Sequence, residues 1–227
     1  MAKKIKKPAR RVRPGNLAED VAVRLREGIR SGQYLAGEPL READLSRALG
    51  VSRVPIREAL HRLVGEGLVE LRPNLGARVA AISELELVEL AELLRLLEAH
   101  LLRRAIPALR PDDLAAAGRM LDELAELDDL AEWSRVNWRF HTRLYRAAER
   151  PMAVALATGL RTRGEGAMQL LIASRARRDE LNREHRELLA LLVAGRSEEA
   201  LALLDRHLSR SRDVVLDLVA DGRPPRS

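Results

Sequence analysis

The sequence LREADLSRALGVSRVPIREALHRLVGEGLVEL, residues 40–71, contains two short amphipathic runs separated by a glycine. Apolar residues recur at helical spacing in both runs. Gly50 follows the last apolar residue of the first run, where a left-handed residue commonly ends a helix. Ser52 can cap the second run, and Pro55 falls in its first turn, where the missing N–H costs little. Two short helices joined by a tight glycine turn predict a helix-turn-helix.

Basic side chains lie on the outward face of the second predicted helix. Arg53 and Arg57 are four residues apart, and His61 continues the same row. In a helix-turn-helix the N-terminal part of the second helix enters the major groove, where Arg can bond guanine O6 and N7 or clamp a phosphate. A solvated charged face is the alternative, and the surrounding turn pattern favours DNA. The residues predicted to contact DNA are Arg41, Ser52, Arg53, Val54, Arg57, His61 and Gly76.

The run GVSRVPIREAL, Gly50–Leu60, resembles the signature of the GntR family of bacterial transcription regulators. The residues after it fit the same family, because two short strand-forming segments flank the turn residues 73–76. The resemblance implies a winged helix over residues 14–80 that binds double-stranded operator DNA. The predicted wing carries Leu75 at its tip, where the family often has a basic residue, and Gly76 allows the backbone to approach DNA closely.

Length and composition describe a globular chain. It has 227 residues, 46% of them hydrophobic and 33% charged, which suits one large domain or two modest ones. The absence of cysteine excludes disulfides and thiolate metal sites. No apolar run reaches membrane-spanning length, and the N-terminus lacks the apolar core of a signal peptide. These features predict a soluble cytoplasmic protein with no membrane partner.

Positive charge is concentrated at the N-terminus. The net charge is +6, and all the lysines lie within residues 1–13, together with three arginines and no acidic residue. Such a segment is predicted to be a disordered basic tail that adds sequence-independent attraction to DNA phosphates. A disordered arm that only aids solubility is the alternative.

The pattern after Ala80 is helical and contains no strand signal. Ser83 and Glu86 have the spacing of a capping box, which predicts a helix start there. Six helices are predicted, over residues 84–105, 112–127, 130–149, 152–174, 178–194 and 197–220. The predicted fold class is therefore mainly α, with an antiparallel all-α bundle over residues 81–222. The bundle resembles the FCD ligand-binding domain of the FadR-like branch of the family, which implies effector binding and dimerisation.

Three histidines lie on the apolar faces of three predicted helices. Apolar side chains flank His141, His185 and His207 at helical spacing. A lone histidine on such a face is usually a core residue, but three on separate inward faces would leave several buried polar atoms to satisfy. A divalent cation satisfies all three, since neutral imidazole is its commonest nitrogen ligand. A polar pocket that binds an effector by hydrogen bonds alone is the alternative.

The FCD resemblance adds a fourth metal ligand. In these domains the metal motif is Asp-x-x-x-His followed by two later histidines, and Asn137 takes the place of the Asp here. The predicted site therefore consists of Asn137, His141, His185 and His207, with zinc, nickel and manganese as the candidate ions. An amide oxygen can coordinate but brings no charge, so the predicted affinity is lower than with Asp.

The predicted function is an effector-responsive regulator that binds a palindromic operator as a homodimer. By resemblance the effector is a small organic acid, whose carboxylate would meet Arg95, with Trp138 as a pocket wall. An architectural DNA-binding protein with a purely structural bundle is one alternative, and the inward histidines weigh against it. A metal hydrolase built on the three histidines is another, but no His-Glu-x-x-His motif is present. The chain is therefore not expected to be an enzyme.

Overall fold

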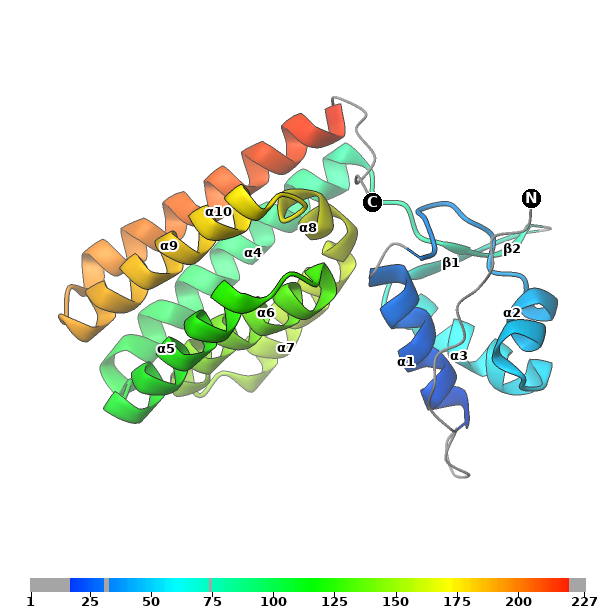
Figure 1. Cartoon of the computed structure of the whole chain (residues 1–227), viewed down its shortest axis with the longest axis horizontal. Helices are drawn as coiled ribbons and strands as arrows, with labels where there is room; N and C mark the ends of the chain where they lie inside the picture. The colour runs from blue at the N-terminus through cyan, green and yellow to red at the C-terminus, as the bar shows by residue number, and fades with distance from the viewer. Residues whose placement is uncertain (1–16, 31–32, 74, 221–227) are drawn as a thin grey trace. The chain divides into compact units, whose positions relative to one another are not determined.

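The computed structural model describes residues 17–30, 33–73 and 75–220. The basic tail predicted at residues 1–13 lies outside this part of the chain. Two compact units divide the chain between Ala81 and Ile82. Figure 1 shows the helices and strands of both units.

The first unit has the element order of a winged helix. Its described elements are α1 (Leu17–Arg30), α2 (Glu42–Leu49), α3 (Arg53–Gly65), β1 (Val69–Arg72) and β2 (Gly76–Val79). Gly50 ends α2 in the left-handed conformation, with φ 69°, and its N–H bonds to the Ser46 carbonyl. Ser52 is the N-cap residue of α3, although its side chain makes no capping hydrogen bond. Helix α1 packs on α3, and Leu25, Ile56 and Leu63 are fully buried. The predicted helix-turn-helix and wing are therefore confirmed.

The wing is tied to the loop that precedes α2. Strands β1 and β2 are antiparallel, with Val69 opposite Val79. On the other side of β2, the Gly37 N–H donates to the Val79 carbonyl at 2.9 Å, and the Val79 N–H donates to the Glu38 carbonyl at 3.0 Å. These bonds fix the position of the wing relative to the start of α2.

The second unit is all helical within the described residues. Its elements are α4 (Glu84–Ala105), the 3-10 helix η1 (Ile106–Ala108), α5 (Pro111–Glu126), α6 (Leu130–Tyr145), the 3-10 helix η2 (Arg146–Ala148), α7 (Pro151–Arg163), α8 (Glu165–Leu171), α9 (Arg175–Val193) and α10 (Ser197–Ala220). The predicted capping box opens α4. The Glu86 N–H donates to Ser83 Oγ at 3.2 Å, and the Ser83 N–H donates to the Glu86 carboxylate at 2.9 Å.

The structure corrects the predicted helix count from six to seven α-helices among the described residues. The single helix expected over residues 152–174 is two helices that separate at Gly164. A Cβ on Gly164 would lie 3.1 Å from Leu90 Cδ2, so glycine lets this junction approach α4 closely. Helix α9 begins before residue 178, because Ser174 caps it by accepting the Arg177 N–H at 3.2 Å.

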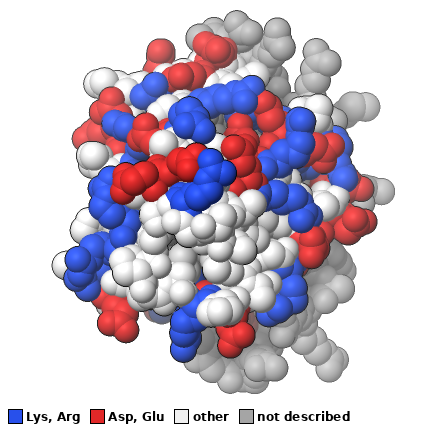
Figure 2. Space-filling view, turned by 90° about the vertical axis from the view of Figure 1, so that its left-hand side faces the viewer, with Lys and Arg blue, Asp and Glu red and all other residues white. Residues whose placement is uncertain are grey.

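Helix α6 supplies the largest side chains of the bundle core. Trp133, Phe140 and Tyr145 are each almost completely buried. Helix α6 packs on α4 and α5, while α10 packs on α4 and α9, so their inward faces meet in the interior. On the face shown in Figure 2, basic and acidic side chains are interspersed around an area that carries neither. Among the described helices, none is long and apolar enough to span a membrane.

Candidate metal centre and nucleic-acid interface

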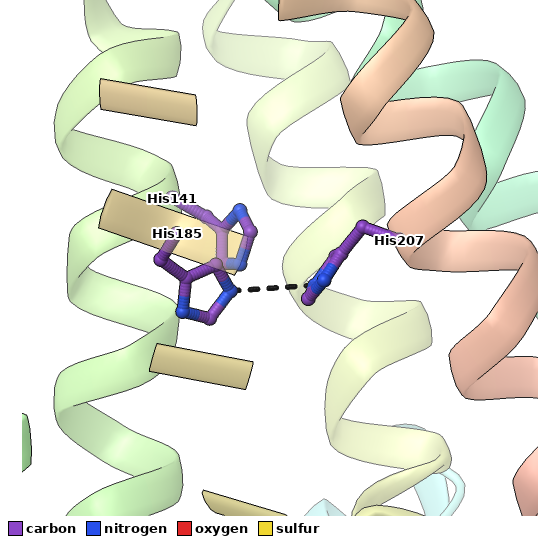
Figure 3. Close-up of side chains that lie close together, drawn as sticks. All are labelled: His141, His185 and His207. Carbon is purple, nitrogen blue, oxygen red and sulfur yellow. Dashed lines mark hydrogen bonds between the residues drawn. The ribbon is translucent and has the colours of Figure 1, made fainter. Parts of the chain in front are cut away.

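Three imidazoles from three helices meet inside the second unit. His141 comes from α6, His185 from α9 and His207 from α10, and all three are buried. One ring nitrogen of each lies within 4.8 Å of the others. The Nε2 atoms of His185 and His207 are 3.3 Å apart, as the dashed line in Figure 3 marks. The structure therefore brings the three predicted histidines together.

A hydrogen-bond chain orients His141. The Tyr145 hydroxyl donates to Glu98 Oε2 at 2.6 Å, and His141 Nδ1 lies 3.2 Å from the Tyr145 oxygen. Because the hydroxyl proton points to the carboxylate, His141 Nδ1 must be the donor to that oxygen. In this tautomer the Nε2 of His141 carries the lone pair, which is the state a metal ligand requires.

A carboxylate from α9 orients His207. His207 Nδ1 lies 2.6 Å from Glu184 Oε2, and Arg210 contacts the other carboxylate oxygen at 3.1 Å. Burial acts to raise the pKa of Glu184, but its hydrogen bond with His207 and the nearby Arg177 and Arg210 outweigh this and lower the pKa. An ionised Glu184 accepts the Nδ1–H of His207, while the Nε2 atom on the other side of the ring lies 3.3 Å from His185 Nε2.

The interior keeps two of the imidazoles neutral. Burial lowers the pKa of both His141 and His185 well below the usual value, and charge on His207 and Arg161 acts in the same direction. Burial also raises the pKa of Glu98, against the hydrogen bond from Tyr145. Neutral imidazoles are the form that binds divalent metals.

Asn137 lies one helical turn before His141 on α6 and is also buried. Its Oδ1 atom has no hydrogen-bond partner in the described part of the chain. A buried amide oxygen without a partner is costly, which makes it suitable as a ligand for a cation or a bound water. The orphaned oxygen is the observation that fits a fourth ligand at Asn137.

The donor set fits a divalent ion in type and spacing. Two nitrogens bound tetrahedrally to zinc at about 2.1 Å lie roughly 3.4 Å apart. The 3.3 Å between His185 Nε2 and His207 Nε2 matches this spacing. A pair of ligand atoms at the 4.8 Å limit would have to approach by about 1.4 Å to reach this tetrahedral spacing.

A cavity of about 80 Å³ adjoins Glu98. Its polar lining includes Glu98, Arg161, Ser211 and Arg212, and leucines from α4, α8 and α10 make up half of the rest. The Arg161 guanidinium carbon lies 5.8 Å from the Trp138 ring centroid, within cation–π range. The cavity thus combines an apolar wall with two cations and a carboxyl group.

Neither residue predicted to contact the effector lines this cavity. Arg95 is half-exposed, and its guanidinium lies 2.6 Å from Asp205 Oδ1. Trp138 packs behind His141, with ring centroids 6.2 Å apart, and its Nε1 donates to Thr158 at 3.3 Å. The roles of Arg95 and Trp138 in effector binding therefore stay predictions, and the cations that line this cavity are Arg161 and Arg212.

One of the residues missed by the sequence analysis had a detectable signal. Glu98 follows Leu87, Leu90 and Leu94 at helical spacing, so it occupies a core position of α4. A carboxylate at such a position needs a buried partner. Glu184 and Arg161 carried no comparable signal, because their roles depend on contacts between helices.

The predicted DNA-contacting residues are solvent-exposed in the first unit. Ser52, Arg53 and Val54 lie at the start of α3, whose N-terminal turn faces DNA in a helix-turn-helix. A surface hollow between α2, α3 and the wing is lined by Arg41, Arg57, His61 and Gly76, among others. Gly76 has φ 74°, which an L side chain rarely adopts. The predicted residues thus fall into two groups, one at the start of α3 and one around the hollow.

These features define a two-domain DNA-binding transcription regulator. The chain belongs to the GntR family and carries an FCD domain: residues 17–79 match the family described as bacterial regulatory proteins, gntR family, and residues 89–210 match the FCD domain. This family consists of transcription regulators, not enzymes, so the hydrolase alternative falls away.

Curated relatives agree with this family, and a solved structure shares the fold. A probable D-xylose utilization operon transcriptional repressor of Paenarthrobacter nicotinovorans is 29% identical over 185 residues, which covers 80% of each chain. The gluconate operon transcriptional repressor of Bacillus subtilis is 27% identical over 220 residues, covering 94% of this chain and 89% of the relative. The fold matches that of E. coli McbR/YncC with a TM-score of 0.77 and 24% identity, over 90% of this chain and 99% of the other.

Proposed function

We propose that this chain is an effector-responsive cytoplasmic regulator that binds a palindromic operator as a homodimer and senses a small organic acid. The observation that carries the proposal is the buried histidine cluster beside a cavity in the helical domain of a winged-helix protein. A purely structural bundle has no need of three buried imidazoles and an orphaned amide oxygen.

In this proposal the cluster holds a divalent metal ion. His141, His185 and His207 supply three nitrogens and Asn137 supplies an amide oxygen, with zinc, nickel and manganese as the candidate ions. Because these ligands are neutral, the bound ion would keep its full charge and attract an anion. The carboxylates of Glu98 and Glu184 bond to Tyr145 and His207 instead.

The adjoining cavity supports an anionic effector. Arg161 lines the cavity and lies close enough to Glu98, His141 and His185 to perturb their pKa values. A carboxylate placed there would gain from this guanidinium. A relative of this chain represses a gluconate operon, and gluconate is itself a small organic acid.

Specific recognition of an operator supports a homodimer. One small helix-turn-helix offers too few base contacts for operator specificity, whereas two heads can read the halves of a palindrome. Exposed apolar side chains lie on two helices that pack together, Leu93 and Leu96 on α4 and Met152 and Leu156 on α7. We propose that a second copy of the chain covers them.

Metal analysis of protein purified without a histidine tag or chelator tests the site. Wild-type protein is expected to bind zinc, nickel or manganese with micromolar or tighter affinity. His185→Ala should lose both metal and effector response while keeping its helical content. His100→Ala is the matched control, because His100 is exposed on α4 and lies outside the cluster. Absence of metal binding in the wild type would refute the metal reading and leave the hydrogen-bonding pocket as the explanation.

A further inference from the structure

The recognition helix has an arginine that is already paired within the protein. Arg57 on α3 donates from Nε to Glu42 Oε1 at 2.9 Å and from Nη2 to Glu42 Oε2 at 3.0 Å. Glu42 is the first residue of α2, so the pair links the two helices of the helix-turn-helix. Both side chains remain accessible, with 64% of Arg57 and 31% of Glu42 exposed.

This pairing leaves a defined edge of the guanidinium free for DNA. An arginine has five N–H donors, and Glu42 takes the Nε–H and one of the Nη2 hydrogens. Within the part of the chain that the structure describes, both Nη1 hydrogens and the second Nη2 hydrogen have no hydrogen-bond acceptor. These donors on the Nη1–Nη2 edge form a fork of the kind that bonds guanine O6 and N7. Arg57 can therefore hold Glu42 and a guanine at the same time.

We propose that Glu42 is a positioning residue for DNA recognition, which holds the Nη1–Nη2 edge of Arg57 ready for a guanine and disfavours phosphate contacts by its own charge. This inference rests on the proposed role of Arg57 in the operator complex. The hydrogen bond from Arg57 lowers the pKa of Glu42, so Glu42 is ionised at neutral pH. A carboxylate on the DNA-facing surface repels every duplex alike, while its hold on Arg57 benefits only a duplex with guanine in the right place.

The two effects of Glu42 give its removal an unusual signature. Glu42→Ala should weaken binding to the operator, because Arg57 loses its fixed orientation, and strengthen binding to unrelated DNA, because a repulsive charge is gone. The ratio of the two affinities is expected to fall about tenfold or more per half-site, within the range for a bidentate base contact. Glu42→Gln keeps one acceptor oxygen and should give an intermediate ratio.

Asp44→Ala is the matched control. Asp44 lies on the same helix, half a turn from Glu42, and its carboxylate pairs with Arg47 at 3.5 Å. Removing it takes away the same charge without touching Arg57. It should raise affinity for both duplexes by a similar factor and leave their ratio nearly unchanged.

Fluorescence anisotropy at constant salt measures these ratios. The specific probe is a duplex selected by the wild-type protein from a randomised library, and the non-specific probe has the same composition in scrambled order. A second specific probe replaces each guanine in turn with 7-deazaguanine, and one position should lose affinity for the wild type but not for Glu42→Ala.

Two results would overturn the inference. In one, Glu42→Ala keeps the same ratio as Asp44→Ala. In the other, the ratio of operator affinity to scrambled-duplex affinity is higher for Glu42→Ala than for the wild type. That result would mean that DNA has to break the Arg57–Glu42 ion pair before it can bind. Arg57→Ala separates this inference from the function on which it rests, because unchanged operator binding by Arg57→Ala would mean that Arg57 reads no base.

Discussion

Replacing Glu184 with glutamine tests whether the carboxylate behind His207 tunes the histidine cluster. Glu184 Oε2 lies 2.6 Å from His207 Nδ1. Glutamine has nearly the same shape and keeps an acceptor oxygen, so the substitution removes the charge and leaves the hydrogen bond possible. A neutral acceptor makes the imidazole a weaker base, and the Nε2 atom a weaker metal ligand.

The structure sets the expected size of this effect. Loss of such a partner typically weakens metal binding 10- to 100-fold, or about 1.4–2.7 kcal/mol. Arg210 contacts Glu184 at 3.1 Å and offsets part of its charge, which places the expected loss near tenfold. Glu180→Gln is the control, because Glu180 lies one turn earlier on α9 and pairs with Arg177 and Arg210 rather than with a histidine.

A competition titration of tag-free protein against a fluorescent zinc chelator at pH 7.5 measures the two affinities. Thermal unfolding with and without zinc gives an independent check, because a ligand that binds only the folded state raises the melting temperature according to its affinity. The reasoning fails if Glu184→Gln and Glu180→Gln weaken zinc binding equally, or if Glu184→Gln binds zinc as tightly as the wild type.

Three further predictions follow from the two units. Arg57→Ala should abolish specific operator binding and Arg53→Ala should weaken it strongly, with a loss of about 1–3 kcal/mol per half-site for each lost bidentate contact, as a gel-shift titration will show. Deleting residues 1–13 should weaken binding to all DNA evenly and flatten its salt dependence, and a sequence-selective loss would contradict this. The chelator-treated protein should lose up to about 2.7 kcal/mol of unfolding free energy between pH 7.5 and 5.5, measured by urea denaturation. The sign follows because His141 and His185 have depressed pKa values in the folded state, so the unfolded chain binds more protons as the pH falls below about 6.5. The raised pKa of Glu98 acts in the opposite direction, so a rise in stability on acidification would mean that the histidines do not dominate.

The features predicted well from sequence are those set by neighbours along the chain. Gly50, Pro55 and the apolar spacing around them define the helix-turn-helix, because capping, turn and periodicity signals act over a few residues. Helical spacing likewise placed His141 and His185 on inward faces. Because the faces of a bundle meet in its interior, that was sufficient to expect the histidines close together.

The features that could not be predicted depend on how distant segments pack. Glu184 lies next to His185 in the sequence, about 100° away around α9, yet both contact His207, which lies 23 residues after Glu184. Arg161 reaches the cavity because α7 packs on α4. The break between α7 and α8 falls at Gly164, the C-cap residue of α7, where an added Cβ would lie 3.1 Å from Leu90 Cδ2.

The hydrogen bonds between β2 and the loop before α2 also affect how the first unit meets other molecules. An exposed strand edge is a template for strand addition and aggregation. The Gly37 and Glu38 backbone occupies the outer edge of β2, so a strand from another chain cannot pair there. The four residues of β1 include Glu70 and Arg72, and short charged strands are poor templates. Because the edge of β2 is covered and β1 is short and charged, many copies of the regulator can bind DNA close together without pairing through the strands of their wings.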